Sequence, residues 1–138
     1  MMTAGILAKK TDVPIYTVRH YTRIGLLKPS KHPGNGYKVY NFSDTTRLRF
    51  IIAAKALGFT LPEISQILDE AKQGNSPCPM VRDIVKLRID ENKKKIQELK
   101  QLQKKMKKAL GYWSEMKNSM PNGDLVCHLI ESVAEMKS

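Results

Sequence analysis

Apolar positions in the first part of the chain recur at helical spacing, in short runs that proline and glycine separate. One run covers residues 5–10, and a second covers residues 15–23 directly after Pro14. Proline suits the first turn of a helix, and glycine suits the position after its end. We therefore predict two short helices. The second stops at Gly25, and the two leucines after that glycine are expected to return to the core.

The next segment, residues 28–40, is rich in turn-forming residues. Two prolines and two glycines stand before a Tyr-Lys-Val-Tyr sequence, which predicts a small β-hairpin with a flexible tip. Helical spacing returns over residues 44–57, where Ser43 is the expected N-cap. Residues 60–63 have the Thr-x-x-Glu spacing of a capping box, so we predict one more helix that runs to about residue 71.

After Gly74 the pattern changes to one long period. Gly111 is the only glycine or proline between Pro79 and Trp113. Apolar residues recur in this stretch at alternating steps of four and three residues, which is the heptad pattern of a coiled coil. Seven of the nine positions of this seam are apolar: Val85, Ile89, Asn92, Ile96, Leu99, Gln103, Met106, Leu110 and Trp113. The two polar positions would fix the register at a cost in stability.

A helix over this stretch would span roughly 50 Å at 1.5 Å per residue, which is longer than the preceding head could cover. Its apolar stripe therefore needs a partner, and the simplest partner is a second copy of the chain. The alternative is a helix that is buried within one subunit.

Composition narrows the class of partner. The 138 residues include 24 Lys and Arg against 13 Asp and Glu, a formal net charge of +11, so we expect attraction to a polyanion. The lysine-rich residues 93–108 surround the heptad seam, and we interpret them as a solvated helix face.

Several classes of protein are excluded. No apolar run is long enough to cross a bilayer and the N-terminus lacks a secretory signal, so we expect a cytoplasmic protein without membrane contact. We expect no enzyme, because no Ser-His-Asp order, phosphate loop or paired carboxylates beside a His occur.

Three segments together indicate a family. They read Thr-Val-Arg-His-Tyr-Thr-Arg-Ile-Gly-Leu-Leu at 17–27, Gly-Tyr-Lys-Val-Tyr at 36–40 and Gly-Phe-Thr-Leu-Pro-Glu-Ile at 58–64. In order and spacing they resemble the mercury-resistance regulator (MerR) family. The resemblance implies a mostly α fold: a winged helix-turn-helix head with a small β-hairpin wing, a long antiparallel coiled-coil dimerisation helix, and a short C-terminal loop and helix. We place the head at residues 1–74, a hinge at 75–79, the coiled-coil helix at 80–116 and the effector-binding end at 117–138.

The residues themselves point to DNA. A helix that carries Arg19, His20, Tyr21 and Arg23 offers long donors to phosphates and base edges in a major groove. The resemblance implies a recognition helix with Thr17, Arg19, Tyr21 and Arg23 and a wing with Tyr37, Lys38 and Tyr40. The family usually has Arg in place of Lys38, and lysine keeps the charge without the bidentate fork.

Two alternatives stay open in this head. The rings of Tyr21 and Tyr40 could pack in the core with a hydrated hydroxyl. His20 could contact the DNA backbone or lie in solvent.

The two cysteines stand in different surroundings. Cys78 lies at the predicted start of the long helix, where the helix N-terminus favours a thiolate, the form that binds a soft metal. The resemblance implies a metal site in which Cys78 of one subunit meets Cys127, with His128 as a third ligand, from the other. Metal-sensing relatives carry a further Cys earlier in the C-terminal loop, where this chain has Lys117, Asn118 or Ser119.

We therefore expect a homodimeric transcription regulator of double-stranded promoter DNA. On binding a divalent ion (mercury, zinc, cadmium or lead) it would distort the promoter so that RNA polymerase can engage it. One alternative is a response to an organic or thiol-reactive inducer through Cys78 or Cys127. Another is that both cysteines are buried apolar residues.

Overall fold

The computed structural model describes residues 1–136, which fall into two compact units. The first unit is Met1–Val81 and the second begins at Arg82, and each is described by itself. Among the described residues, no helix combines the length and the apolar character that a membrane span requires.

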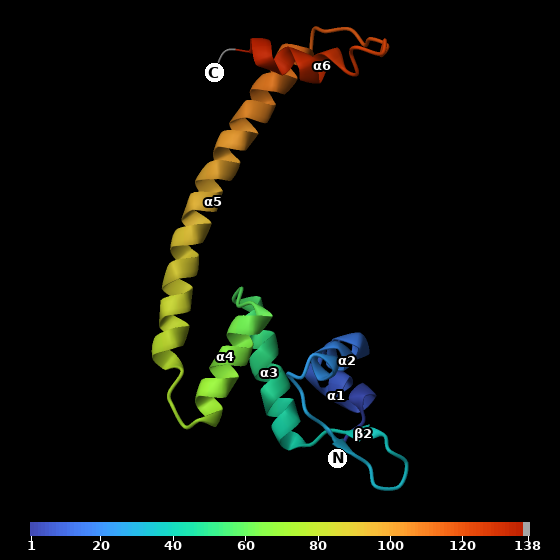
Figure 1. Cartoon of the computed structure of the whole chain (residues 1–138), viewed down its shortest axis with the longest axis vertical. Coiled ribbons are helices and arrows are strands. Elements are labelled where there is room, and N and C mark those ends of the chain that lie inside the picture. The colour runs from blue at the N-terminus through green and yellow to red at the C-terminus, as the bar shows by residue number, and fades with distance from the viewer. Residues whose placement is uncertain (137–138) are drawn as a thin grey trace. The chain divides into compact units, whose positions relative to one another are not determined.

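The first unit is a small helical head with a two-stranded hairpin. Its elements are α1 (Ala4–Thr11), α2 (Ile15–Arg23), β1 (Ser30–Lys31), β2 (Lys38–Val39), α3 (Phe42–Ala56) and α4 (Leu61–Lys72). Helix α1 packs against α2 and α3, and α3 lies beside α4 (Figure 1). The side chains that are almost wholly buried come from all four helices, the connection after α2 and the hairpin: Leu7, Val18, Leu27, Tyr40, Thr45, Leu48, Ile51 and Ile64. The mostly helical, hairpin-bearing head that we predicted is confirmed.

The predicted end of α2 is confirmed in detail. Gly25 has a φ of 87°, in the left-handed region that side chains other than glycine rarely adopt. The backbone N–H groups of Leu26 and Leu27 both donate to the Tyr21 carbonyl, at 2.9 and 3.1 Å. Both leucine side chains are buried, so the chain returns to the core directly after the glycine.

The start of α3 differs from our prediction, because Asn41 and not Ser43 is the N-cap. The Asn41 side chain accepts from the Asp44 N–H at 3.1 Å, and the Asp44 carboxylate accepts from the Asn41 N–H at 2.9 Å. This reciprocal pair satisfies two backbone donors, whereas a serine cap satisfies one. Ser43 instead donates its hydroxyl to the Asn41 side chain at 2.6 Å. The predicted capping box of Thr60 and Glu63 at the start of α4 is confirmed.

The hairpin is short and is anchored at its base. Strands β1 and β2 are antiparallel, and Ser30 lies opposite Val39. Below them Met2 and Tyr40 exchange two backbone hydrogen bonds, each of 2.7 Å. The residue after Met2 is the N-cap of α1, whose side chain accepts from the Ile6 N–H at 3.2 Å. The base of the hairpin is therefore joined to the start of α1.

Helix α5 (Cys78–Trp113) begins and ends earlier than the predicted 80–116. Its first backbone bond runs from the Val81 N–H to the Pro77 carbonyl, at 2.9 Å. At the other end the Ser114 hydroxyl donates to the Gly111 carbonyl at 2.8 Å. Glycine and a side chain that competes for backbone carbonyls both weaken a helix, which explains the earlier end.

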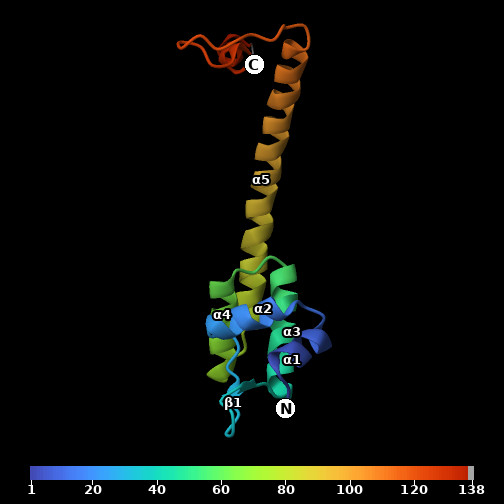
Figure 2. The ribbon, with the colours of Figure 1, turned by 90° about the vertical axis from the view of Figure 1, so that its right-hand side faces the viewer.

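The second unit consists of most of α5 and a C-terminal segment with α6 (His128–Glu131) and a 3-10 helix, η1 (Ser132–Glu135). Figure 2 shows the loop of residues 114–127 leaving the end of α5 and leading back into α6. The Trp113 indole N–H donates to the Ser132 hydroxyl at 3.3 Å, and Ser132 and Ala109 are buried. The C-terminal segment is thus packed on the last turns of α5.

Candidate nucleic-acid interface and effector site

Helix α2 has one face in the core and one in solvent. Val18 and Tyr21 are 0% and 8% exposed, and their three-residue spacing places them on the same side. Arg19 and Arg23, four residues apart, are both exposed. The helical period alone therefore turns both guanidinium groups outward.

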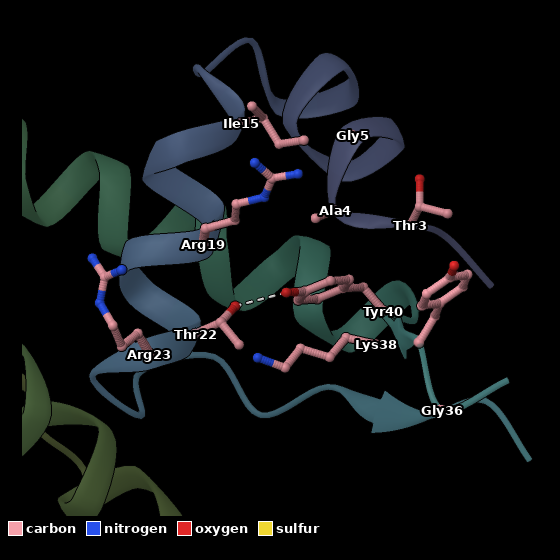
Figure 3. A pocket seen from close by; sticks show the side chains of 11 residues that line it. Thr3, Ala4, Gly5, Ile15, Arg19, Thr22, Arg23, Gly36, Lys38 and Tyr40 are labelled. Carbon is pink, nitrogen blue, oxygen red and sulfur yellow. Dashed lines mark hydrogen bonds between the residues drawn. The ribbon is translucent and has the colours of Figure 1, made fainter.

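The exposed arginines border an open hollow of about 1050 Å³ between α2, the start of α1 and the hairpin. Figure 3 shows Arg19 and Arg23 on α2 and Lys38 on the hairpin around this space. We call it the basic hollow. The residues that line it are Thr3, Ala4, Gly5, Ile15, Arg19, Thr22, Arg23, Gly36, Tyr37, Lys38 and Tyr40. Three of these side chains are cationic and none is acidic, so the hollow suits a polyanion.

The other predicted residues of α2 are Thr17, His20 and Tyr21, and Tyr21 is buried. Thr17 and His20 are half-buried and do not line the basic hollow. An Arg23 guanidinium nitrogen lies 3.3 Å from His20 Nδ1, and the arginine must donate because it has no acceptor. The His20 and Tyr21 ring centroids are 5.6 Å apart. His20 therefore contacts Arg23 on one side and lies near the buried Tyr21 ring on the other.

The three predicted wing residues occupy two environments. Tyr37 is 72% exposed and Lys38 is also exposed, whereas Tyr40 is only 1% exposed. The Tyr40 hydroxyl lies 2.7 Å from the Thr22 hydroxyl on α2. The rings of Tyr21 and Tyr40 thus both lie in the core, and the hairpin is joined to α2 through a side chain.

Two residues that support this surface were not singled out from the sequence. The Thr22 hydroxyl is hydrogen-bonded to the Tyr40 hydroxyl, and Arg47 on α3 donates its Nε–H to the Leu26 carbonyl at 2.7 Å. Both contacts join residues 18 or more positions apart, so no local pattern indicates them. No sequence signal marked Arg47, and its half-buried position on α3 is known only from the structure.

The predicted metal ligands lie at the starts of two helices. Cys78 is the exposed first residue of α5, and its backbone N–H donates to the Ser76 hydroxyl at 3.3 Å. Cys127 is the half-buried N-cap of α6, and His128 is the first residue of that helix. The Ser119 hydroxyl and His128 Nδ1 form a hydrogen bond. Cys78 belongs to the first unit, and Cys127 and His128 belong to the second.

The described residues of one chain supply few ligands for a metal ion. Within residues 1–136 there is no group of three or more His, Cys, Asp or Glu side chains that could hold a metal ion. Thiolate and imidazole are suitable donors for soft and borderline ions, but a four-coordinate site needs more ligands than Cys127 and His128. A complete site therefore requires a further ligand from elsewhere.

Comparison with known proteins identifies the family. The model of the MerR HTH family regulatory proteins matches residues 2–71, and the model described as MerR, DNA binding matches residues 45–109. The chain is 31% identical over 131 residues to the mercuric resistance operon regulatory protein of Bacillus cereus, covering 94% of each chain. It is 34% identical over 103 residues to the regulator HmrR of Rhizobium leguminosarum, covering 75% of this chain and 79% of that one.

A solved structure agrees over nearly the whole length. The transcription regulator PbrR691 from Ralstonia metallidurans, in complex with lead(II), superposes with a TM-score of 0.74 at 27% identity. The superposition covers 96% of this chain and 99% of that one. With a family model over more than half of its length and the helix-turn-helix head in place, the chain belongs to the MerR family of DNA-binding transcriptional regulators, which are not enzymes.

Proposed function

We propose that this regulator binds promoter DNA as a homodimer and changes the shape of that DNA when a soft divalent metal ion binds. The observation that carries the proposal is the basic hollow, where two segments far apart in sequence present three cations and no acid. DNA carries one negative charge per about 1.7 Å of its axis. Electrostatic attraction therefore favours binding of a duplex to this surface.

In the proposed complex α2 enters the major groove and the wing contacts the neighbouring backbone. Arg19 and Arg23 would reach base edges or phosphates, with Thr17, His20 and the hydroxyl of Tyr21 beside them. Lys38 and Tyr37 would contact phosphates, and lysine serves this role as a point charge. The burial of Tyr40 supports a different role for that residue, which is argued below.

The proposed dimer forms through α5. Ile96, Leu99 and Leu110 of the heptad seam are 52%, 63% and 68% exposed in the single chain. Apolar side chains repeated along one face of a long helix favour a coiled coil with a second copy, and the resemblance to the family implies that the two helices are antiparallel. The lysines on the other faces then remain in solvent.

The proposed metal site takes Cys78 from one subunit and Cys127 and His128 from the other. If Nδ1–H of His128 donates to the Ser119 hydroxyl oxygen, Nε2 is the unprotonated nitrogen of that imidazole and would bind the ion. Two thiolates and an imidazole suit mercury, lead, zinc or cadmium. A relative that regulates a mercuric resistance operon and a lead-bound relative of the same fold support an ion of this class.

An ion shared between subunits would change the angle between the two DNA-binding heads. The DNA bound by both heads would then bend or twist, which is how we propose that RNA polymerase gains access to the promoter. The expected response is therefore activation through DNA shape.

Metal titration of the purified dimer tests this proposal. We expect sub-micromolar binding of at least one ion of a mercury, lead, zinc and cadmium panel, and loss of that binding in both Cys78→Ser and Cys127→Ser. Met120→Leu is a matched control, because this exposed loop methionine also carries sulfur but is outside the site. Unchanged affinity in both cysteine variants would reject the site. A covalent adduct on either thiol without reversible metal binding would favour a thiol-reactive inducer instead.

A further inference from the structure

Tyr40 stands at the junction of three segments of the head. Its backbone exchanges two hydrogen bonds with Met2, each of 2.7 Å, and its ring is 1% exposed. Its hydroxyl reaches the Thr22 hydroxyl at 2.7 Å, drawn as the dashed line in Figure 3. The base of the hairpin, the start of the chain and α2 are therefore joined through this residue.

The direction of the hydroxyl hydrogen bond follows from a second contact. Thr22 Oγ1 also lies 2.8 Å from the Val18 carbonyl oxygen, which can only accept. The single proton of Thr22 is therefore donated to Val18, and Tyr40 must donate its own proton to Thr22. While this bond is present, the Tyr40 hydroxyl has no proton left to donate to a DNA phosphate.

We propose that Tyr40 is a positioning residue, which fixes the wing relative to α2 and leaves the DNA contacts to its neighbours. Thr22 lies between Arg19 and Arg23 in α2, and Tyr40 is two residues after Lys38 in the hairpin. All five residues line the basic hollow. One hydrogen bond therefore sets the spacing between the cations of α2 and the cation of the wing.

This inference rests on the proposed DNA contacts and deepens them. Phosphates recur along a duplex at fixed intervals, so cations on two segments act together only when the distance between those segments is held. A wing that moved freely would have to be ordered each time the protein binds, and that ordering costs conformational entropy. The hydrogen bond between Thr22 and Tyr40 thus prepares the surface before DNA arrives.

The test uses the full-length dimer and a fluorescent duplex that the intact protein selects from a random-sequence library. Tyr40→Phe keeps the ring and removes the proton, and Thr22→Val keeps the shape and removes the acceptor. We expect each variant to weaken binding about fivefold, the worth of one hydrogen bond, and to lower the salt dependence by about one phosphate contact.

Two further variants separate positioning from direct contact. The double variant Thr22→Val with Tyr40→Phe should bind no more weakly than either single variant, because both remove the same bond. Thr22→Ser, which retains a hydroxyl, should restore binding. Tyr112→Phe, on α5, is the control for loss of a tyrosine hydroxyl elsewhere. Additive effects, or a loss in Tyr40→Phe with none in Thr22→Val, would mean that Tyr40 contacts phosphate and would overturn the proposal.

Amide hydrogen exchange of the free protein completes the test without DNA. The His32 amide donates to the Tyr37 carbonyl within the hairpin, and the Tyr40 amide donates to the Met2 carbonyl at the base of the hairpin. Both single variants should speed their exchange, and Tyr112→Phe should not. Unchanged exchange in both would also overturn the proposal. If the intact protein selected no duplex, the DNA interface itself would fail, while the exchange result would still decide the hydrogen bond.

Discussion

At the scale of single residues, exposure separates side chains that look equivalent in sequence. Tyr37 and Tyr40 lie three positions apart in one hairpin, yet they are 72% and 1% exposed. The first can meet a partner, and the second is part of the core. The same division applies in α2, where Tyr21 is buried between two exposed arginines.

Removing the lysine or an arginine of the basic hollow should change DNA binding in different ways. We expect Lys38→Ala to weaken binding to all duplexes alike and to reduce the salt slope by about one, because in the proposed complex this lysine contacts phosphate. Arg19→Ala should cost about 1–3 kcal/mol at the preferred sequence and relax that preference. Fluorescence titrations with a selected and a scrambled duplex distinguish the two. Lys95→Ala, an exposed lysine of α5, is the control and should change neither quantity.

Burial also predicts the cost of removing leucine side chains. Leu48 in α3 is 0% exposed, and Leu57, the C-cap residue of the same helix, is 72% exposed. We expect Leu48→Ala to lower the free energy of unfolding by about 2–5 kcal/mol and Leu57→Ala by no more than about 0.5 kcal/mol. Urea denaturation followed by circular dichroism measures both, and equal losses would contradict the packing described.

At the scale of elements, the helix termini decide where each side chain points. The N-cap of α3 sets the phase at which Leu48 and Ile51 enter the core. The capping residue follows hairpin residue Tyr40 directly, so the end of the hairpin and the start of the helix are one continuous structure.

The cap of α3 can be tested by two neighbouring substitutions. Asn41→Ala should cost about 1 kcal/mol of stability, because an N-cap side chain satisfies an otherwise unpaired backbone donor. Ser43→Ala should cost much less, since Ser43 only donates to the Asn41 side chain. Thermal unfolding of both variants measures the difference. A larger loss of stability in Ser43→Ala than in Asn41→Ala would mean that Ser43 is the N-cap.

At the scale of the whole molecule, α5 carries an apolar stripe that the proposed dimer would cover. Seven of its nine seam residues are exposed, Val85 and Trp113 are half-buried, and Ala109 is the one residue of this helix that is buried within the described part of the chain. The first unit ends at Val81. Among the described residues of the second unit, the C-terminal segment packs on α5 only near the end of that helix.

Dimerisation through this stripe is open to direct measurement. Leu99→Lys places a charge in the proposed seam and should shift the protein toward monomer and weaken DNA binding, because each head alone makes half the contacts. Gln101→Lys introduces the same charge on another face of the helix and should leave the dimer intact. Analytical ultracentrifugation reports the oligomeric state. A stable Leu99→Lys dimer would place the interface on another surface.

The sequence alone determined the helices, the hairpin, the heptad seam and the family, because these depend on local periodicity, on capping residues such as Thr60 and Glu63, and on motif spacing. It also indicated Arg19, Arg23 and Lys38 as exposed cations. Only the tertiary structure decided that Tyr40 is buried and that its hydroxyl meets Thr22. That contact joins a hairpin to a helix through packing of the core, and no pattern of neighbouring residues encodes which side chains a folded chain brings together.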